Sequence, residues 1–167
     1  MAVTSGTAVL TLPSDTQILM TREFDAPKHL VYQAYTTPEH VKRWFAGRNG
    51  EVTSAEIDLR VGGTWRYVMR VAEAGFEIAF HGEYSELVPN ERIVTTEVFE
   101  GMPDGTGAGV ETLNVVTFTE TDGRATLEIL TECGTQEIRD MILQTGMEDG
   151  MQGSMDALEE VAVSLRG

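Results

Sequence analysis

The sequence has 167 residues, of which 41% are hydrophobic, and its 27 acidic and 12 basic side chains give a formal net charge of −15 at pH 7. A chain of this length forms one domain with a substantial core, and its negative charge disfavours binding to nucleic acid or to an anionic membrane surface. The single cysteine, Cys133, excludes an internal disulfide, and no hydrophobic run approaches the roughly 20 residues of a membrane span. We therefore expect a cytoplasmic protein without membrane insertion.

The first part of the chain predicts a strand followed by two short helices. Residues 1–15 carry no charged side chain before Asp15 and are interpreted as an N-terminal arm, with a single domain over residues 16–167. The segment 16–24, "TQILMTREF", alternates and is rich in β-forming residues, which predicts a strand. Over residues 25–47 the hydrophobic spacing becomes helical, and Pro27 and Pro38 suit the first turns of two helices, with Thr37 as N-cap of the second.

The middle of the chain predicts an antiparallel sheet. Turn signals such as Asp122-Gly123 separate successive alternating segments, and the short connections between them are typical of a meander. The connection at 101–109, "GMPDGTGAG", is long for a hairpin and rich in glycine. The predicted strands are 51–59, 63–72, 76–87, 92–100, 110–120 and 124–132.

The last part of the chain predicts two helices. Residues 135–144 form the first, and Thr145 and Glu148 match a capping box at the start of the second. From there hydrophobic residues recur at spacings of three and four, which is typical of a long amphipathic helix. This stripe comprises Met147, Met151, Met155, Leu158, Ala162 and Leu165. The order of elements predicts an α+β fold in which a long C-terminal helix lies across one antiparallel sheet.

Catalytic and metal-binding motifs are not visible, and we predict no metal and no cofactor. The histidine in "AFHGEY", His81, lies beside Glu83, and these two residues are the candidates for acid–base catalysis. Strand parity places Phe80 and Tyr84 on one face and both candidates on the other. If the apolar face is the inner one, His81 points to solvent, unless a bulge at Gly82 reverses the parity.

A set of large, adaptable hydrophobic residues lies on the faces predicted to be buried. The set is either an ordinary core or the wall of a cavity, and methionine suits surfaces that accept more than one packing. Gly150 and Gly153 weaken the start of the long helix, so that it can move when a ligand enters, or they only permit close packing. The candidate ligand-binding residues are Trp65, Tyr67, Met69, Phe80, Tyr84, Met147, Met151 and Met155.

Several segments resemble one known family. Residues 22–45, "REFDAPKHLVYQAYTTPEHVKRWF", resemble the opening of the activator of heat-shock-protein-90 ATPase homologue-like family, with its R-x-F-x-A-P start and closing Trp-[aromatic] pair. The segments "IDLRVGGTWRYVMR" and "GEYSELVPNERIVTT" are similar to two later segments of that family. The resemblance implies the helix-grip fold of the START-like SRPBCC superfamily, related to birch-pollen allergens, with an apolar cavity between the curved sheet and the long C-terminal helix. Where many members have Trp after a Gly, this sequence has Gly146-Met147 and Gly150-Met151.

Three functions remain open from the sequence. The leading hypothesis is the binding of a small hydrophobic molecule in the apolar cavity. The second is an SRPBCC-type enzyme, such as a cyclase, dehydratase or hydrolase, that uses the same cavity. The third is a stress-related co-chaperone that acts on a heat-shock-protein-90-type ATPase, and the protein is either a monomer or a homodimer.

Overall fold

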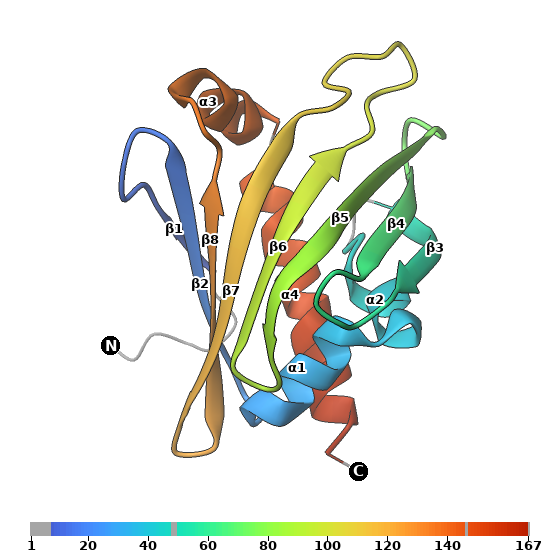
Figure 1. The fold of residues 1–167 in the computed structure, drawn as a ribbon. Coiled ribbons are helices and arrows are strands. Elements are labelled where there is room, and N and C mark those ends of the chain that lie inside the picture. Colours follow the sequence, from blue (N-terminus) through green and yellow to red (C-terminus); the bar gives the residue numbers. More distant parts are fainter. Residues whose placement is uncertain (1–7, 48–49, 146, 167) are drawn as a thin grey trace.

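The structure, a computed structural model, describes residues 8–47, 50–145 and 147–166. Within these ranges it contains one eight-stranded sheet and four helices (Figure 1). The strands are β1 (Val9–Thr11), β2 (Gln17–Phe24), β3 (Gly50–Ile57), β4 (Thr64–Val71), β5 (Glu77–Val88), β6 (Arg92–Phe99), β7 (Glu111–Thr121) and β8 (Arg124–Glu132). The helices are α1 (Lys28–Thr36), α2 (Pro38–Trp44), α3 (Gln136–Gln144) and α4 (Met147–Ser164).

The sheet is antiparallel throughout, in the order β1-β2-β8-β7-β6-β5-β4-β3. Strands β3 to β8 form a meander, and α1 and α2 carry the chain from β2 at one side to β3 at the far edge. The long helix α4 lies across one face of the curved sheet, with α1 and α2 beside it (Figure 1). The predicted α+β helix-grip architecture is therefore confirmed. No helix in the described ranges is both long enough and apolar enough to cross a bilayer.

The tight connection between β7 and β8 follows from local backbone chemistry. Asp122 and Gly123 both have positive φ, 53° and 79°, as a two-residue hairpin turn of the primed type requires. Thr121 pairs with Arg124 directly across this turn. The dipeptide thereby sets the register of both strands, and with it the face to which each of their side chains points.

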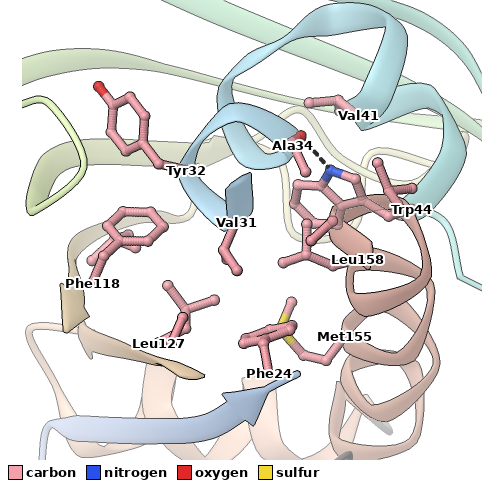
Figure 2. Packing of buried hydrophobic residues seen from close by; sticks show 14 of the residues in the cluster. Phe24, Val31, Tyr32, Ala34, Val41, Trp44, Phe118, Leu127, Met155 and Leu158 are labelled. Carbon is pink, nitrogen blue, oxygen red and sulfur yellow. Dashed lines mark hydrogen bonds between the residues drawn. The ribbon is translucent and has the colours of Figure 1, made fainter. Parts of the chain in front are cut away.

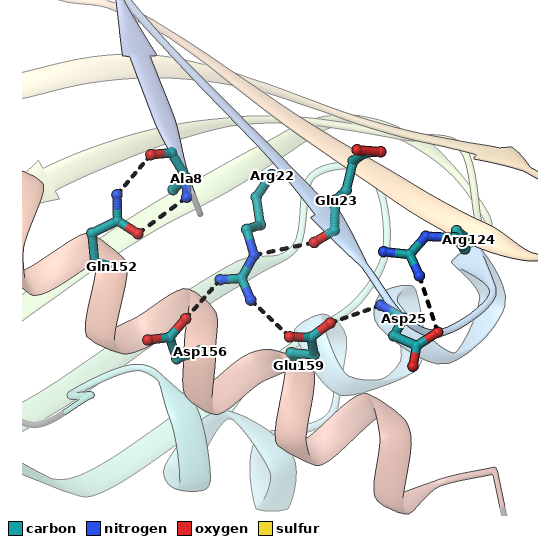
Figure 3. A network of polar contacts seen from close by, with 8 residues as sticks. All are labelled: Ala8, Arg22, Glu23, Asp25, Arg124, Gln152, Asp156 and Glu159. Atoms are coloured by element: carbon teal, nitrogen blue, oxygen red, sulfur yellow. Dashed lines mark hydrogen bonds and ion pairs between the residues drawn. The ribbon is translucent and has the colours of Figure 1, made fainter. Parts of the chain in front are cut away.

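Part of the predicted N-terminal arm belongs to the sheet. Residues 9–11 form the edge strand β1 and pair with β2, with Val9 opposite Thr21. The backbone of Ala8 accepts one hydrogen bond from the side chain of Gln152 (2.6 Å) and donates another to it (3.1 Å) (Figure 3). A strand of three residues is too short to show an alternating pattern, so the sequence did not predict it.

Threonine hydroxyls at the helix ends do not all act as predicted. Thr135 caps α3 by accepting a hydrogen bond from the amide of Ile138 (3.1 Å). Thr37 is the N-cap residue of α2 by position, but its hydroxyl donates to the carbonyl of Gln33 (2.7 Å). The capping box predicted at Thr145 is wrong, because that hydroxyl donates to the carbonyl of Ile142 (2.6 Å) and helix α4 begins two residues later. A Ser or Thr hydroxyl readily bonds back to a carbonyl of the preceding turn, and here it satisfies one carbonyl at the end of α3.

The main core lies between the inner face of the sheet and the helices. Figure 2 shows Phe24, Phe118 and Leu127 of the sheet facing Leu158 and Met155 of α4. The predicted stripe is buried at Met155, Leu158 and Ala162 of α4 and partly buried at Met147 and Met151, and its last member, the partly buried Leu165, follows the end of the helix. The indole of Trp44 donates a hydrogen bond to the carbonyl of Ala34 (2.9 Å), which links α2 to α1 (Figure 2).

A buried arginine holds α4 against β2. The side chain of Arg22 is fully buried and forms ion pairs with Asp156 (3.1 Å) and Glu159 (2.9 Å) of α4 (Figure 3). Its Nε donates to the carbonyl of Glu23, and its guanidinium lies 5.0 Å from the ring centre of Phe24. Because these bonds use three separate guanidinium nitrogens, they determine the orientation of the side chain and the position of α4 along the strand.

Candidate functional site

A cavity of about 40 Å³ remains between the inner face of the sheet and the first two helices. Strands β4 to β7 form its floor, the end of α1 contributes one side chain, and the end of α2 contributes two. Six of its ten lining residues are aromatic, and the other four are Ile, Thr, Glu and Asn. The lining residues are Tyr35, Trp44, Phe45, Trp65, Tyr67, Tyr84, Ile93, Thr95, Glu97 and Asn114.

The aromatic rings of the lining support one another. Tyr35 stacks on Trp44 with ring centres 5.2 Å apart, and Phe45 meets Tyr67 edge-on at 4.9 Å. Trp65 and Tyr67 are neighbours on the same face of β4, with ring centres 4.6 Å apart. Contacts of this kind are favourable beyond the area that they bury, so the rings of the wall help to hold one another in place.

The position of Trp65 depends on Gly82 of the adjacent strand β5 and on Thr95 of β6, the next strand along the sheet. Its indole N–H donates a hydrogen bond to the hydroxyl of Thr95 (2.8 Å), and that hydroxyl lies within donor distance of the carbonyls of Glu83 and Thr96. The indole lies directly over Gly82, where an added Cβ would be 2.6 Å from the indole nitrogen and 1.9 Å from the carbonyl oxygen of Thr96. Glycine is therefore required at position 82 for the indole to reach the cavity wall.

A carboxyl group lies at the polar end of the cavity. The side-chain amide of Asn114 donates to Glu97 (3.2 Å), and the hydroxyl of Thr131 donates to the amide oxygen of Asn114 (2.7 Å). In this arrangement the amide nitrogen of Asn114 faces the carboxyl and its oxygen faces Thr131. Burial raises the pKa of Glu97 above its usual value, and the hydrogen bond from Asn114 opposes this change only in part. A buried carboxyl group stays ionised only when a nearby positive charge or hydrogen-bond donors compensate for its lost hydration.

Three tyrosines bring hydroxyl groups to the same cavity. The pKa values of Tyr35, Tyr67 and Tyr84 are all raised, and burial is the main cause for each. The negative charge of Glu97 adds to this effect for Tyr35 and Tyr67, which places both near the carboxyl. The three hydroxyls are therefore neutral at physiological pH, and none bonds to another residue in the described part of the chain. They are available to donate to a ligand or to accept from it.

The structure brings together only some of the predicted ligand-binding residues. Trp65, Tyr67 and Tyr84 line the cavity. Phe80 lies just behind the lining, with its ring centre 5.7 Å from that of Phe45. The predicted methionines lie elsewhere: Met155 is buried in the main core, Met151 packs against that core, and Met69 and Met147 are half-buried outside the lining.

One of the two glycines in α4 lies at a close contact. Gly47, at the turn after α2, faces the helix so closely that an added Cβ would lie 2.9 Å from the carbonyl carbon of Gly153 and 2.8 Å from the nitrogen of Ser154. The hydroxyl of Ser154 also donates to the carbonyl of Phe45 (2.8 Å). This contact favours close packing as the reason for Gly153, and it holds Phe45 at the cavity.

The candidate acid–base pair lies on the outer face of the sheet. The register between β5 and β6 is continuous from His81 to Tyr84, and its irregularity falls between Tyr84 and Glu86, after Gly82. His81 is 45% exposed and bonds through Nδ1 to Glu100 (2.8 Å), while Glu83 is exposed. Because neither side chain faces the cavity, neither can act on a molecule bound there.

Sequence reasoning missed the polar part of the site. Glu97 and Asn114 occupy inward positions of β6 and β7, in the same rows as the buried Ile93 and Val116. A carboxyl on the parity of Ile93 in "RIVTTEVFE" is the signal that could have identified Glu97. Tyr35, Trp44 and Phe45 were assigned to the two helices, but nothing local indicates that these helix ends reach the sheet.

The described surface also has a second, more open hollow. An open groove of about 440 Å³ runs beside the end of α4, between Asp25, Glu159 and Val163. It is shallow, and two of its polar residues, Asp25 and Glu159, belong to the network around Arg22. Among the described residues, no group of three or more His, Cys, Asp or Glu side chains is placed to hold a metal ion.

The sheet curled around α4, with a cavity on its inner face, defines a helix-grip protein. The profile of the family described as "Activator of Hsp90 ATPase homolog 1-like protein" matches residues 25–162. The chain belongs to this family, and the resemblance seen in the sequence is confirmed. No curated protein matches the chain.

Solved structures with the same fold come from several bacteria. A protein from Rhodobacter sphaeroides is 22% identical with a TM-score of 0.83, over 94% of this chain and 99% of that chain. A protein from Chromobacterium violaceum is 27% identical with a TM-score of 0.70, over 87% of this chain and 96% of that one. An AHSA1-like protein from Aeromonas hydrophila is 19% identical with a TM-score of 0.63, over 88% of this chain and 93% of that one. These similarities establish the fold.

Proposed function

We propose that this protein binds a small, largely hydrophobic organic molecule in the cavity between β4–β7 and the ends of α1 and α2. One observation carries the proposal: six aromatic side chains and a partly desolvated carboxyl surround a space that the core leaves unfilled. Protein cores normally pack to crystal density, and a polar group without sufficient partners is costly inside them. A ligand would fill the space and satisfy the polar groups.

The size of the cavity sets a condition on this function. A volume of about 40 Å³ holds only a few water molecules, whereas sites for small molecules usually measure about 300–1,000 Å³. Binding therefore requires the cavity to widen. Tyr35, Phe45, Glu97 and Asn114 are half-buried, while the other lining residues are buried, so the opening lies at the polar end.

The start of α4 is the element best placed to move. It lies at the end of the sheet where β6, the strand that carries Glu97, finishes (Figure 1). Its first turns carry the half-buried Met147, Gly150 and Met151, whereas the buried part of the helix begins at Gly153. A methionine-bearing turn can repack around ligands of different shapes at low cost.

A thermal-shift screen tests the binding function. Lipids, flavonoids and polyketide-like compounds would be added to the wild-type protein and to Trp65→Ala, with the outer-face variant Glu83→Ala as the matched control. We expect a subset of compounds to raise the melting temperature of the wild type and of Glu83→Ala but not of Trp65→Ala. A library that stabilises none of the three proteins, or all three equally, would contradict the proposal.

A second function is favoured by Glu97 itself. A carboxyl with a raised pKa inside a cavity, next to neutral tyrosine hydroxyls, is suited to general acid–base catalysis. Mass spectrometry of a stabilising compound after incubation with the protein separates the two functions. Unchanged compound supports binding alone, and conversion that is lost in Glu97→Gln supports an enzyme. The only basis for the chaperone alternative is the name of the family, and no contact described above favours it.

A further inference from the structure

We propose that the ligand carries a cationic group, a protonated amine or a quaternary ammonium, which pairs with Glu97 in the aromatic cavity. This inference rests on the ligand-binding function proposed above and specifies the chemical class of the ligand. It follows from the charges of the lining, from the arrangement of the rings and from the field of the whole molecule.

The carboxyl of Glu97 lacks a counter-charge in the described protein. None of the ten lining residues is Lys, Arg or His, and the hydrogen bond from the neutral amide of Asn114 is the one that the carboxyl receives among the described residues. The buried cation Arg22 shows the contrast, because two carboxylates, those of Asp156 and Glu159, pair with it. A desolvated carboxylate gains most from a partner of opposite charge, and here that partner has to come from the ligand.

The aromatic rings favour the same partner. The face of a Trp, Tyr or Phe ring is negative and attracts a cation within about 6 Å of its centre. Tyr35 and Tyr67 lie close enough to Glu97 for its charge to affect their pKa values, and each packs against a further aromatic ring, Trp44 and Phe45 respectively. A cation at the carboxyl would therefore lie among ring surfaces. A ligand anion would meet repulsion from Glu97 and no compensating cation among the described lining residues.

The charge of the whole chain acts in the same direction. A formal net charge of −15 raises the local concentration of cations and lowers that of anions around the protein. Anionic lipids such as free fatty acids are thus disfavoured as ligands. The competing possibility is a protonated Glu97 that donates a hydrogen bond to a neutral carbonyl on the ligand, and the experiment is designed to distinguish it.

Three probes of similar size separate these cases: benzylamine, which is cationic, benzyl alcohol, which is a neutral donor, and acetophenone, which is a neutral acceptor. Each would be titrated into ¹⁵N-labelled protein while the indole N–H signals of Trp44 and Trp65 are followed by NMR. We expect benzylamine to bind the wild type about tenfold more tightly than benzyl alcohol. This preference should disappear in Glu97→Gln and persist in the outer-face control Glu83→Gln.

The pH dependence of benzylamine binding provides a second measurement that needs no variant. Its affinity should fall when the pH is lowered from about 8 to about 4, because Glu97, whose pKa is raised by burial, takes up a proton while the amine stays charged. The other titratable groups of the lining are Tyr35, Tyr67 and Tyr84, and their raised pKa values keep them neutral over this range. A constant affinity would overturn the inference.

The outcomes distinguish this inference from the function on which it rests. Equal affinities for benzylamine and benzyl alcohol, unchanged in Glu97→Gln, would overturn the cation and leave ligand binding intact. Tighter binding of acetophenone would also overturn it, in favour of a protonated Glu97. If no probe shifts the Trp65 indole signal, both the inference and the binding function at this cavity fail.

Discussion

At the scale of single residues, Glu97 links the stability of the protein to its site. Burial raises its pKa in the folded chain, so the folded state binds this proton more tightly than the unfolded state does. Stability then falls as the pH rises from the unfolded to the folded pKa, and the loss is complete above the folded pKa. At neutral pH the ionised carboxyl therefore destabilises the fold.

Glu97→Gln should therefore stabilise the protein at neutral pH. We expect the free energy of unfolding at about pH 7 to rise by about 0.5–2 kcal/mol. The gain should shrink as the pH is lowered towards about 4, where both states protonate the carboxyl. Urea denaturation at a series of pH values measures this, with Glu83→Gln on the outer face as a control that stays within about 0.5 kcal/mol. A variant that is less stable than the wild type at neutral pH would refute the prediction.

A second prediction at this scale concerns Gly82. In Gly82→Ala the new methyl group meets the carbonyl of Thr96 and the indole of Trp65, so one of them has to move. We expect a loss of about 1–3 kcal/mol in the free energy of unfolding and a shifted indole N–H signal for Trp65, whose bond to Thr95 is disturbed. Glu83→Ala, one position along the same strand and exposed, is the matched control. An unchanged Trp65 signal in Gly82→Ala would show that the contact is not tight.

At the scale of elements, the attachment of α4 depends on Arg22. Arg22→Ala removes a fully buried side chain and leaves the partly buried Glu159, which is 20% exposed, without this partner. We expect the free energy of unfolding to fall by about 2–4 kcal/mol. The pair between Arg124 and Asp25 lies nearby but is exposed (Figure 3), so Arg124→Ala should cost less than about 1 kcal/mol. Equal effects of the two substitutions would mean that burial of the pair is not what matters.

The contact between α2 and α4 makes a further prediction, at Gly47. This residue has a positive φ of 57°, and its Cα faces the backbone of α4 at Gly153. Gly47→Ala should lower the free energy of unfolding by about 2–4 kcal/mol, because backbone strain and overpacking combine. Gly123 also has a positive φ, but it faces open space. Gly123→Ala should therefore lose only the strain energy, about 1–2 kcal/mol, and the difference between the two variants measures the helix contact.

At the scale of the whole molecule, the dominant property is the net charge of −15. Repulsion among like charges destabilises a compact state, and salt screens it over a Debye length of about 10 Å at 0.1 M. We expect the melting temperature at neutral pH to rise by about 2–5 °C between about 20 mM and about 500 mM NaCl. KCl should have the same effect because screening does not depend on the ion. A melting temperature that is unchanged or lower in both salts would contradict the prediction.

Much of the architecture could be predicted because it depends on local periodicity. The alternation through Trp65 and Tyr67 identified a strand and its buried face, and the spacing from Met155 to Leu158 and Ala162 identified the inner face of α4. Both patterns report a backbone geometry that each segment imposes on its own side chains. The same reasoning placed His81 and Glu83 away from the buried parity of their strand.

The sequence could not predict which residues interact when they lie far apart along the chain. Arg22 and Glu159 are separated by 137 positions, and Glu97 and Asn114 meet only because β6 and β7 pair in one register. The cavity exists where the ends of α1 and α2 approach strands β4 to β7, so its lining is a property of packing between elements. A periodic pattern shows which face of a segment is buried, but only the assembled fold determines what that face meets. In this protein the sequence indicated a row of buried aromatic residues, and the fold determines that this row lines a cavity with a carboxyl at its polar end.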